Sequence, residues 1–205
     1  METEKIDLVK TDKAYYNPPT KPVEVTLAPY PYLTVTGAGA PGGEAHIAAI
    51  QSLFTLAYSL KFAYKAQNQD SAVAKLEGLW WFLDESKRFG EVPREEWQWK
   101  LLIRVPDFMK ESMFKTVKAE TVQKKPELVR ITDVNFEDFN EGHCVQMMHV
   151  GSYASESETV AQIFAYMKEH NLVQNGKHHE LYITDVSKNP ETGKTILRYP
   201  VRSAS

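Results

Sequence analysis

The sequence lacks several features that define whole classes of protein. Its 205 residues include one cysteine, Cys144, which excludes an internal disulfide and a zinc site built from paired cysteines. No run of about 18 apolar residues occurs, so no membrane-spanning helix is expected. The chain starts with Met1-Glu2-Thr3-Glu4, which does not resemble a secretory signal. These absences favour a cytoplasmic location.

The sequence also lacks a large excess of either positive or negative charge. The chain has 24 basic and 27 acidic residues and a formal net charge of −3, so no charge excess attracts it to nucleic-acid phosphates or anionic lipid. Its composition is that of a globular protein, with 42% hydrophobic, 25% charged and 11% aromatic residues. A chain of this length buries about 70% of its unfolded surface. We therefore expect a folded protein that binds neither nucleic acid nor membrane.

Motifs for cofactors and metals are weak. Residues 37 to 43 are rich in glycine and precede a helical pattern, but Pro41 and the absence of a following lysine do not fit a phosphate-binding loop. His178 and His179 are adjacent on a predicted strand and therefore point to opposite faces. Only His178 and Glu180 could share an ion, and two ligands make a poor metal site. We expect no cofactor and no metal.

Hydrophobic periodicity divides the chain into helices and strands. Pro18, Pro19 and Pro22 interrupt the first segment, so residues 1–22 are predicted to be an extended arm before a single domain at 23–205. A capping pattern from Ser155 to Glu158 predicts a helix that ends near His170. The other predicted elements are strands at 24–36, 75–83, 96–105, 128–133, 143–150, 178–186 and 195–201, a long helix at 44–66 and a short connecting helix within 107–126.

The order strand, helix, strand, strand therefore occurs twice. Residues 100–106 (KLLIRVP) match residues 194–200 (KTILRYP) at both charges and at the proline, and the two preceding strands also align, from Lys75 and from Lys177. The chain is predicted to be a tandem duplication with repeats at about 23–106 and 127–205, joined by a short helical linker. Such a unit gives an α+β fold, with two main helices on one face of an antiparallel sheet and a ligand cleft on the other.

Alternation along the strand at 178–186 selects candidate site residues. Side chains of His178, Glu180 and Tyr182 share one face, and those of His179, Leu181 and Ile183 share the other, which we expect to meet the helix. The repeat alignment places Trp80 and Phe82 in the positions that match the Glu180 face. A carboxylate among aromatic rings attracts cations or accepts a proton near neutral pH.

Structural roles for the same residues stay open. Glu180 is also explained as an exposed carboxylate or as the partner of a neighbouring cation, because perturbed carboxylates mark sites only statistically. Trp80 and Phe82 are of residue types that more often form a core than contact a ligand. Cys144 fits a buried structural thiol better than a nucleophile.

Several long motifs, in order from about Pro22 to Arg202, resemble the GyrI-like small-molecule-binding family. This family includes effector-binding domains of multidrug-responsive transcription regulators. The residues that carry the resemblance are those at 76–81 (LEGLWW), 97–99 (WQW), 104–108 (RVPDF), 141–146 (EGHCVQ), 149–153 (HVGSY), 178–182 (HHELY) and 194–201 (KTILRYPV). The double tryptophan and the His-His-Glu motif are most similar to stand-alone members that act as cyclopropanoid cyclopropyl hydrolases.

The resemblance implies a curved sheet with a ligand cleft between two pseudo-symmetric halves. In the regulators a buried glutamate accepts cationic aromatic ligands, and Glu180 is its match here. As a hydrolase, the protein would use Glu180 to activate water and Tyr182 or Tyr153 to donate a hydrogen bond to the developing oxyanion. The residues that would contact the planar substrate are Trp80, Phe82, Trp99, Tyr64 and His178.

Two classes of function follow. The first is a protein that binds small planar or cationic organic molecules and hydrolyses reactive cyclopropane-containing toxins, without a cofactor. The alternative is a non-enzymatic interaction module, similar to the gyrase inhibitors that give the family its name. A transcription regulator is disfavoured, because the 22 residues before the repeats are too few for a helix-turn-helix domain.

Overall fold

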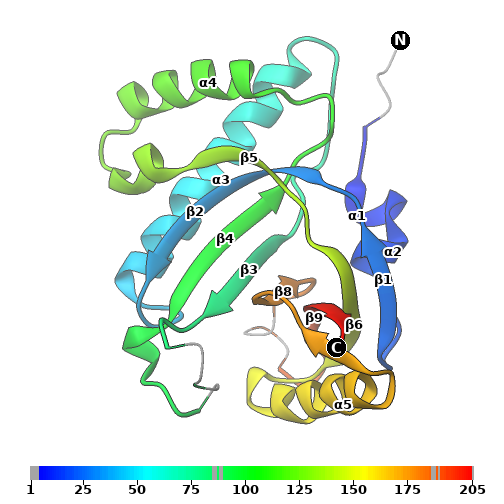
Figure 1. Ribbon diagram of the computed structural model, residues 1–205. Coiled ribbons are helices and arrows are strands. Elements are labelled where there is room, and N and C mark those ends of the chain that lie inside the picture. Colours follow the sequence, from blue (N-terminus) through cyan, green and yellow to red (C-terminus); the bar gives the residue numbers. More distant parts are fainter. Residues whose placement is uncertain (1–4, 85–86, 88–89, 186–187, 189, 205) are drawn as a thin grey trace. The chain divides into compact units, whose positions relative to one another are not determined.

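The computed structural model describes residues 5–84, 87, 90–185, 188 and 190–204, and shows the expected α+β fold (Figure 1). The chain forms two compact units, each of which is described by itself. The first contains the residues up to Thr11, Tyr30–Ala74 and Gly78–Phe139. The second contains Asp12–Pro29, Lys75–Glu77 and the chain from Asn140 onward. None of the helices in these described ranges has the length and apolar character needed to span a bilayer.

The first unit is built on one long helix and four strands. Helix α3 spans Glu44–Lys65, and its Leu53, Leu56 and Leu60 recur at helical spacing and are fully buried. The strands lie in the order β3-β4-β2-β5, where β2 pairs antiparallel with both neighbours. Their bounds are β2 Tyr30–Ala38, β3 Leu76–Trp81, β4 Gln98–Arg104 and β5 Asn135–Phe139. Helix α4, Glu111–Lys124, and the short helices η1, Arg94–Glu96, and η2, Val129–Asp133, complete the unit.

The second unit has the same plan. Helix α5 spans Glu156–Glu169, and the strands lie in the order β1-β6-β9-β8, with β7 paired to β9. Their bounds are β1 Val23–Leu27, β6 Gly142–Val150, β7 Leu172–Gln174, β8 His178–Tyr182 and β9 Lys194–Ser203. The predicted strand at 178–186 is therefore shorter than expected, and its Val186 lies outside the described residues.

Matching the two strand orders confirms the duplication and shows an exchange of edge strands. Strand β3 corresponds to β8, β4 to β9 and β2 to β6, as the sequence alignment predicts. Strand β1, at the start of the first repeat, pairs with β6 of the second, whereas β5, near the start of the second repeat, pairs with β2 of the first. The predicted strand at 24–36 is thus divided at Ala28 and Pro29, and its two parts belong to different units.

The prediction that the His179, Leu181 and Ile183 face meets the helix is wrong. Ile163 and Met167 of α5 pack with Val145, Met147, Leu197, Tyr199 and Val201 in one buried cluster. Leu197 pairs directly with Glu180, and directly paired residues share a face, so α5 covers the face that carries Glu180. The expectation rested on β8 alone, whereas the apolar residues of β6 and β9 decide where the helix packs.

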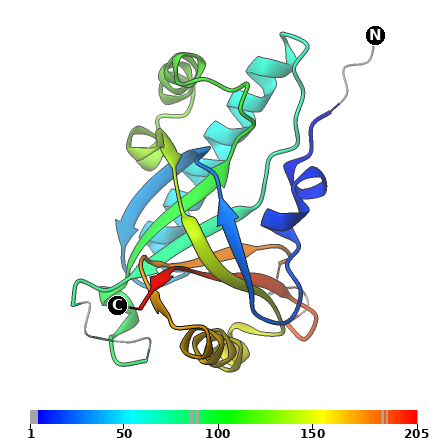
Figure 2. The same ribbon diagram turned by 45° about the vertical axis from the view of Figure 1, so that its right-hand side comes forward.

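The opposite face of the second unit is covered as well. Helix α2, Lys13–Tyr16, lies on that side of β6, β9 and β8, while α5 lies on the other (Figure 2). The residues before Val23 were predicted to be one extended arm, but the described ones include α2 and helix α1, Leu8–Thr11. Tyr15 and Tyr16 are almost completely buried, which explains how so short a helix is held.

One further strand prediction is wrong. Residues 128–133 contain the 3₁₀ helix η2 in place of a strand, and the strand that pairs with β2 begins two residues later, at Asn135. Ile131 of η2 is buried, so its apolar residues serve the core without extending the sheet. The long helix, the connecting helix and the remaining predicted strands are confirmed to within a few residues at their ends.

Candidate functional site

Glu180 on β8 is held at both carboxylate oxygens. His178 Nε2 lies 3.0 Å from Glu180 Oε1, and the Tyr182 hydroxyl donates to Glu180 Oε2 over 2.8 Å. The Glu180 side chain keeps 15% of its surface exposed, against 6% for His178. The structure therefore brings three sequence-predicted residues into one cluster, with the carboxylate at its accessible edge.

Two further tyrosines extend this cluster. Tyr199 of β9 packs its ring 4.7 Å from the His178 ring, at an interplanar angle of 32°. Tyr153, from the short helix η3 (Tyr153–Ser155), meets the Tyr182 ring edge-on at 6.4 Å and is 52% exposed. Tyr153 thus joins the predicted catalytic residues, whereas Tyr199, at 3% exposure, is a buried support that sequence reasoning did not select.

Glu156, the first residue of α5, is a second carboxyl group that the sequence did not reveal. Burial and the negative charge of Glu180 raise the pKa of Glu156 to about 9, although the neighbouring Thr195 hydroxyl lowers it somewhat. Glu156 Oε1 and the Thr195 hydroxyl are both buried, and the Thr195 hydroxyl is the hydrogen-bonding group beside the Glu156 carboxyl. Glu156 is accordingly a neutral carboxylic acid at neutral pH. In the sequence, Glu156 is marked only by its place in the capping pattern from Ser155 to Glu158.

The loop that carries Tyr153 and Glu156 is anchored by His149. This buried side chain of β6 contacts the Thr159 hydroxyl through Nδ1 at 2.8 Å and the Ser152 carbonyl through Nε2 at 3.0 Å. Gly151 has φ of +143°, and a Cβ there would lie 2.9 Å from Ser155 Oγ. Because both the conformation and the space favour glycine, the chain turns sharply here. The turn fixes where α5 begins.

The cluster combines groups with complementary chemistry. Burial and neighbouring carboxylates raise the pKa of Tyr153 to about 12 and that of Tyr199 further still, so both phenols remain hydrogen-bond donors at neutral pH. Each oxygen of an ionised carboxylate has two acceptor sites, so Glu180 can still accept from a water or attract a cation. The arrangement therefore suits cation binding and proton transfer.

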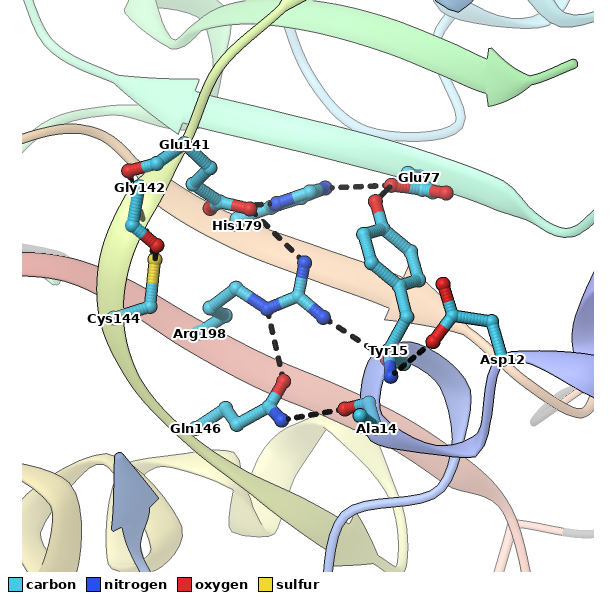
Figure 3. A network of polar contacts seen from close by, with 10 residues as sticks. All are labelled: Asp12, Ala14, Tyr15, Glu77, Glu141, Gly142, Cys144, Gln146, His179 and Arg198. Atoms are coloured by element: carbon cyan, nitrogen blue, oxygen red, sulfur yellow. Dashed lines mark hydrogen bonds and ion pairs between the residues drawn. The ribbon is translucent and has the colours of Figure 1, made fainter. Parts of the chain in front are cut away.

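The other face of the same strands carries a buried ion network (Figure 3). His179 Nδ1 lies 2.8 Å from Glu141 Oε1, and Arg198 donates to Glu141 Oε2 over 2.9 Å. His179 Nε2 lies 3.0 Å from Glu77, which also accepts from the Tyr15 hydroxyl. Arg198 completes its contacts at Gln146 and at the Tyr15 carbonyl. The His178-His179 pair thus divides between the candidate site and a structural network.

Charge complementarity holds this network together. The cations of His179 and Arg198 lower the pKa of Glu141 to about 2 against the effect of burial, and Glu141 with Glu77 raises the pKa of His179 to about 9. Both groups are ionised at neutral pH. Burial and Glu141 also raise the pKa of Cys144 far above its ordinary value, so this thiol is inert, in agreement with its predicted structural role.

The candidate residues of the first unit lie in its core. Trp80 and Trp99 are 4% and 0% exposed. Both rings contact the ring of His46 at the start of α3, with centroid distances of 5.7 Å for Trp80 and 5.3 Å for Trp99. Phe82 packs edge-on to Trp97 at 6.0 Å. The buried Tyr64 accepts a hydrogen bond from the Lys110 amide. The contacts of these four aromatic residues are those of core residues. That any of them contacts a ligand stays a prediction.

Metal binding finds no support in the geometry. No group of three or more His, Cys, Asp or Glu side chains in the part of the chain that the structure describes could hold an ion.

Comparisons with solved structures identify relatives along almost the whole chain. An uncharacterized conserved protein from Listeria innocua is 38% identical, with a TM-score of 0.90, and the match covers 97% of this chain and all of the other. Two structures of hydrolases from Listeria innocua, one encoded by lin2189, are 37% and 36% identical at the same coverage, with TM-scores of 0.88 and 0.85. No curated protein matches the chain.

The family comparison agrees with the duplicated fold described above. The GyrI-like small molecule binding domain matches residues 20–202, which include β1, all residues of the Glu180 cluster and most of β9. The chain therefore belongs to the GyrI-like small molecule binding domain family.

Proposed function

We propose that this protein binds planar or cationic aromatic molecules beside Glu180 and hydrolyses those that contain a reactive cyclopropane. The arrangement of Glu180 supports this most directly: a largely buried carboxylate, oriented by His178 and Tyr182, still has acceptor capacity for a water or a cation. Two relatives named as hydrolases point to the addition of water. The resemblance to cyclopropanoid hydrolases suggests the kind of bond.

The proposed reaction opens a cyclopropane that is conjugated to a dienone. Glu180 accepts a proton from water while the water oxygen bonds to the ring methylene. The ring C–C bond breaks, and its electron pair moves through the dienone to the carbonyl oxygen. That oxygen finally takes up the proton that water lost, so the product is the substrate plus one water.

Tyr153 is the proposed donor to the developing oxyanion. The Tyr182 hydroxyl already donates to Glu180, whereas Tyr153 is half exposed beside it and stays protonated because its pKa is raised. A donor aimed at developing charge stabilises the transition state, and loss of one such donor costs roughly 10²–10³ in kcat. Trp80, Phe82, Trp99 and Tyr64 remain proposed ligand contacts of the first unit.

A ring-opening assay tests this proposal. The protein is incubated with a spirocyclopropyl cyclohexadienone alkylator, and the hydrated product is followed by mass spectrometry. Glu180→Gln keeps the shape of the side chain but removes the base, so we expect it to bind the compound and lose most turnover. Glu158→Gln, at an exposed position on α5, is the matched control and should turn over like the wild type.

Other outcomes contradict the proposal. Equal turnover by Glu180→Gln and the wild type would remove Glu180 from the chemistry. A stable complex with gyrase, together with no ligand that raises the melting temperature, would favour the interaction module in place of a small-molecule site.

A further inference from the structure

One face of helix α3 carries exposed apolar side chains along most of its length. Ile47, Tyr58 and Phe62 are 46%, 48% and 58% exposed, and Phe54, between them, is partly exposed. In chain order these residues follow one another at intervals of seven, four and four, so they lie on one side of the helix. The rings of Phe54 and Tyr58 lie 6.4 Å apart, and those of Tyr58 and Phe62 lie 6.5 Å apart. These four residues form the α3 stripe.

The α3 stripe lies on the side of the helix that faces away from the core. Leu53 and Leu60 are fully buried, and the strands β2 and β4 lie along one side of α3 (Figure 1). Five residues along a helix correspond to a rotation of about 140°, so Tyr58 points away from the direction of Leu53. Single exposed apolar residues are ordinary, but a contiguous row of them is typical of an interaction surface. None of the four belongs to the Glu180 cluster.

The α3 stripe is complementary to itself when two copies run in opposite directions. Ile47 lies seven residues before Phe54, and Phe62 lies seven residues after Thr55. A twofold axis that passes between positions 54 and 55 therefore sets each Ile47 against the Phe62 of a second copy. The same axis sets Tyr58 against the uncharged side chain of Gln51. No like charges meet along this line of contact.

The charged ends of α3 fit the same axis. Glu44 in the first turn lies ten residues before Phe54, and Lys65 in the last turn lies ten residues after Thr55. Each Glu44 therefore meets the Lys65 of the other copy. Lys65 Nζ lies 3.5 Å from Asp70 Oδ2 and the side chain keeps 57% of its surface exposed, so it can approach a second carboxylate. A parallel pair would set like charges together at both ends, which disfavours that arrangement.

We propose that this protein forms a twofold-symmetric dimer in which two α3 helices pack antiparallel through the α3 stripe. The dimer goes beyond the function proposed above and does not depend on it. Helices that cross at about 20° stay in contact over several turns, and the 22 residues of α3 span about 33 Å. One helix pair buries less surface than the roughly 800 Å² per partner of a standard interface, so we expect association at micromolar concentrations.

Sedimentation velocity of the full chain tests the dimer. Between about 1 μM and 1 mM the wild type should change from monomer to dimer. Phe62→Gln should weaken association by at least about tenfold, because the substitution occurs twice in a symmetric dimer. Val150→Gln is the control, since Val150 is as exposed as Tyr58 but lies on β6, and it should associate like the wild type. A wild type that stays monomeric throughout, or a dimer that Phe62→Gln leaves intact, would overturn the proposal.

Disulfide cross-linking tests the antiparallel direction. The native Cys144 is buried and inert, so an introduced surface cysteine is the one that oxidises. A mixture of Glu44→Cys and Lys65→Cys should give a mixed cross-linked dimer, which keeps the native charge pair at its other end. Neither variant alone should cross-link to itself at that rate, because equivalent ends of the two helices lie about 30 Å apart. Absence of the mixed product, or equally fast self-linking of either variant, would refute the antiparallel arrangement.

Discussion

The Tyr15 hydroxyl donates a hydrogen bond of 2.5 Å to Glu77, and both residues are completely buried although they lie 62 positions apart. The Tyr15 carbonyl accepts from Arg198, and Gln146 donates to the carbonyl of Ala14. Through these bonds the segment before β1 becomes part of the second unit. It closes the face of β6, β8 and β9 that α5 leaves open.

Tyr15→Phe should destabilise the protein by about 1–3 kcal/mol, because the buried Glu77 carboxylate loses a donor while the ring is retained. Urea unfolding measures the change. Tyr58→Phe is the control, since Tyr58 is 48% exposed on α3 and should change stability by less than about 0.5 kcal/mol. Equal effects of the two substitutions would show that the Tyr15 hydroxyl is unimportant.

Glu141→Gln should be more costly, by about 3–5 kcal/mol at neutral pH, because it leaves the buried cations of His179 and Arg198 without their shared carboxylate. The pKa of Glu141 is lowered on folding from 4.5 to about 2, so its contribution is present above pH 4.5 and lost as pH falls through 2. Melting temperatures across this range should fall more steeply for the wild type than for Glu141→Gln. Parallel slopes would contradict this account of the network.

Glu156→Gln should change the alkaline side of the stability profile. Folding raises the pKa of Glu156 to about 9, so the folded state retains a proton that the unfolded chain loses above its ordinary pKa of 4.5. Stability of the wild type therefore falls with increasing pH between these values. Relative to the wild type, Glu156→Gln should become more stable as pH rises, and Glu158→Gln should not. A constant difference across the range would show that Glu156 is ionised in the folded protein.

His149→Leu should loosen the loop before α5, because it removes the contacts to Ser152 and Thr159. The buried Thr159 hydroxyl loses its imidazole partner, whereas the Ser152 carbonyl still accepts from Ser155. We expect a loss of about 2–4 kcal/mol, with faster amide hydrogen exchange at residues 152–155. Thr159→Val is the matched comparison, since it breaks the Nδ1 contact and leaves the one to Ser152. Unchanged loop exchange in His149→Leu would rule out the anchoring role.

Gly37→Ala tests the packing of β2 against Trp99 of the next strand. A Cβ at Gly37 would come within 2.3 Å of the ring, so the substitution should cost about 1–3 kcal/mol by overpacking. Combined with Trp99→Phe, whose ring is shorter, the substitution should cost less than it does alone. Additive effects in this double-mutant cycle would mean that the ring does not set the limit.

Much of the fold followed from local patterns. The helix at 44–66 was predictable because its apolar residues recur at a spacing that one helix face can bury. Leu53 and Leu60 of that pattern are fully buried, whereas Ile47 is 46% exposed. The duplication was predictable because KLLIRVP and KTILRYP repeat within one chain. The strand predicted at 128–133 was wrong because an apolar segment this short is compatible with a strand and with a buried 3₁₀ turn equally.

The candidate site was predictable only in part. The strict alternation of side chains on β8 placed His178, Glu180 and Tyr182 together. Alternation determines which residues share a face, but it does not determine what covers that face. The helix α5 was therefore predicted on the His179 face, whereas it packs on the Glu180 face. Glu156 and Thr195 escaped notice because only folding brings their separate elements beside Glu180.

The sequence alone thus determined the repeated α+β plan, the family resemblance and the grouping of the strand residues, because these depend on local periodicity and on motifs within the chain. Tertiary structure decided the exchange of β1 and β5, the face that α5 covers and the pairing of His179 and Arg198 with Glu141. These features depend on contacts between distant segments. A buried charge or an apolar face is stabilised by whichever partner the fold brings to it, and local sequence does not name that partner.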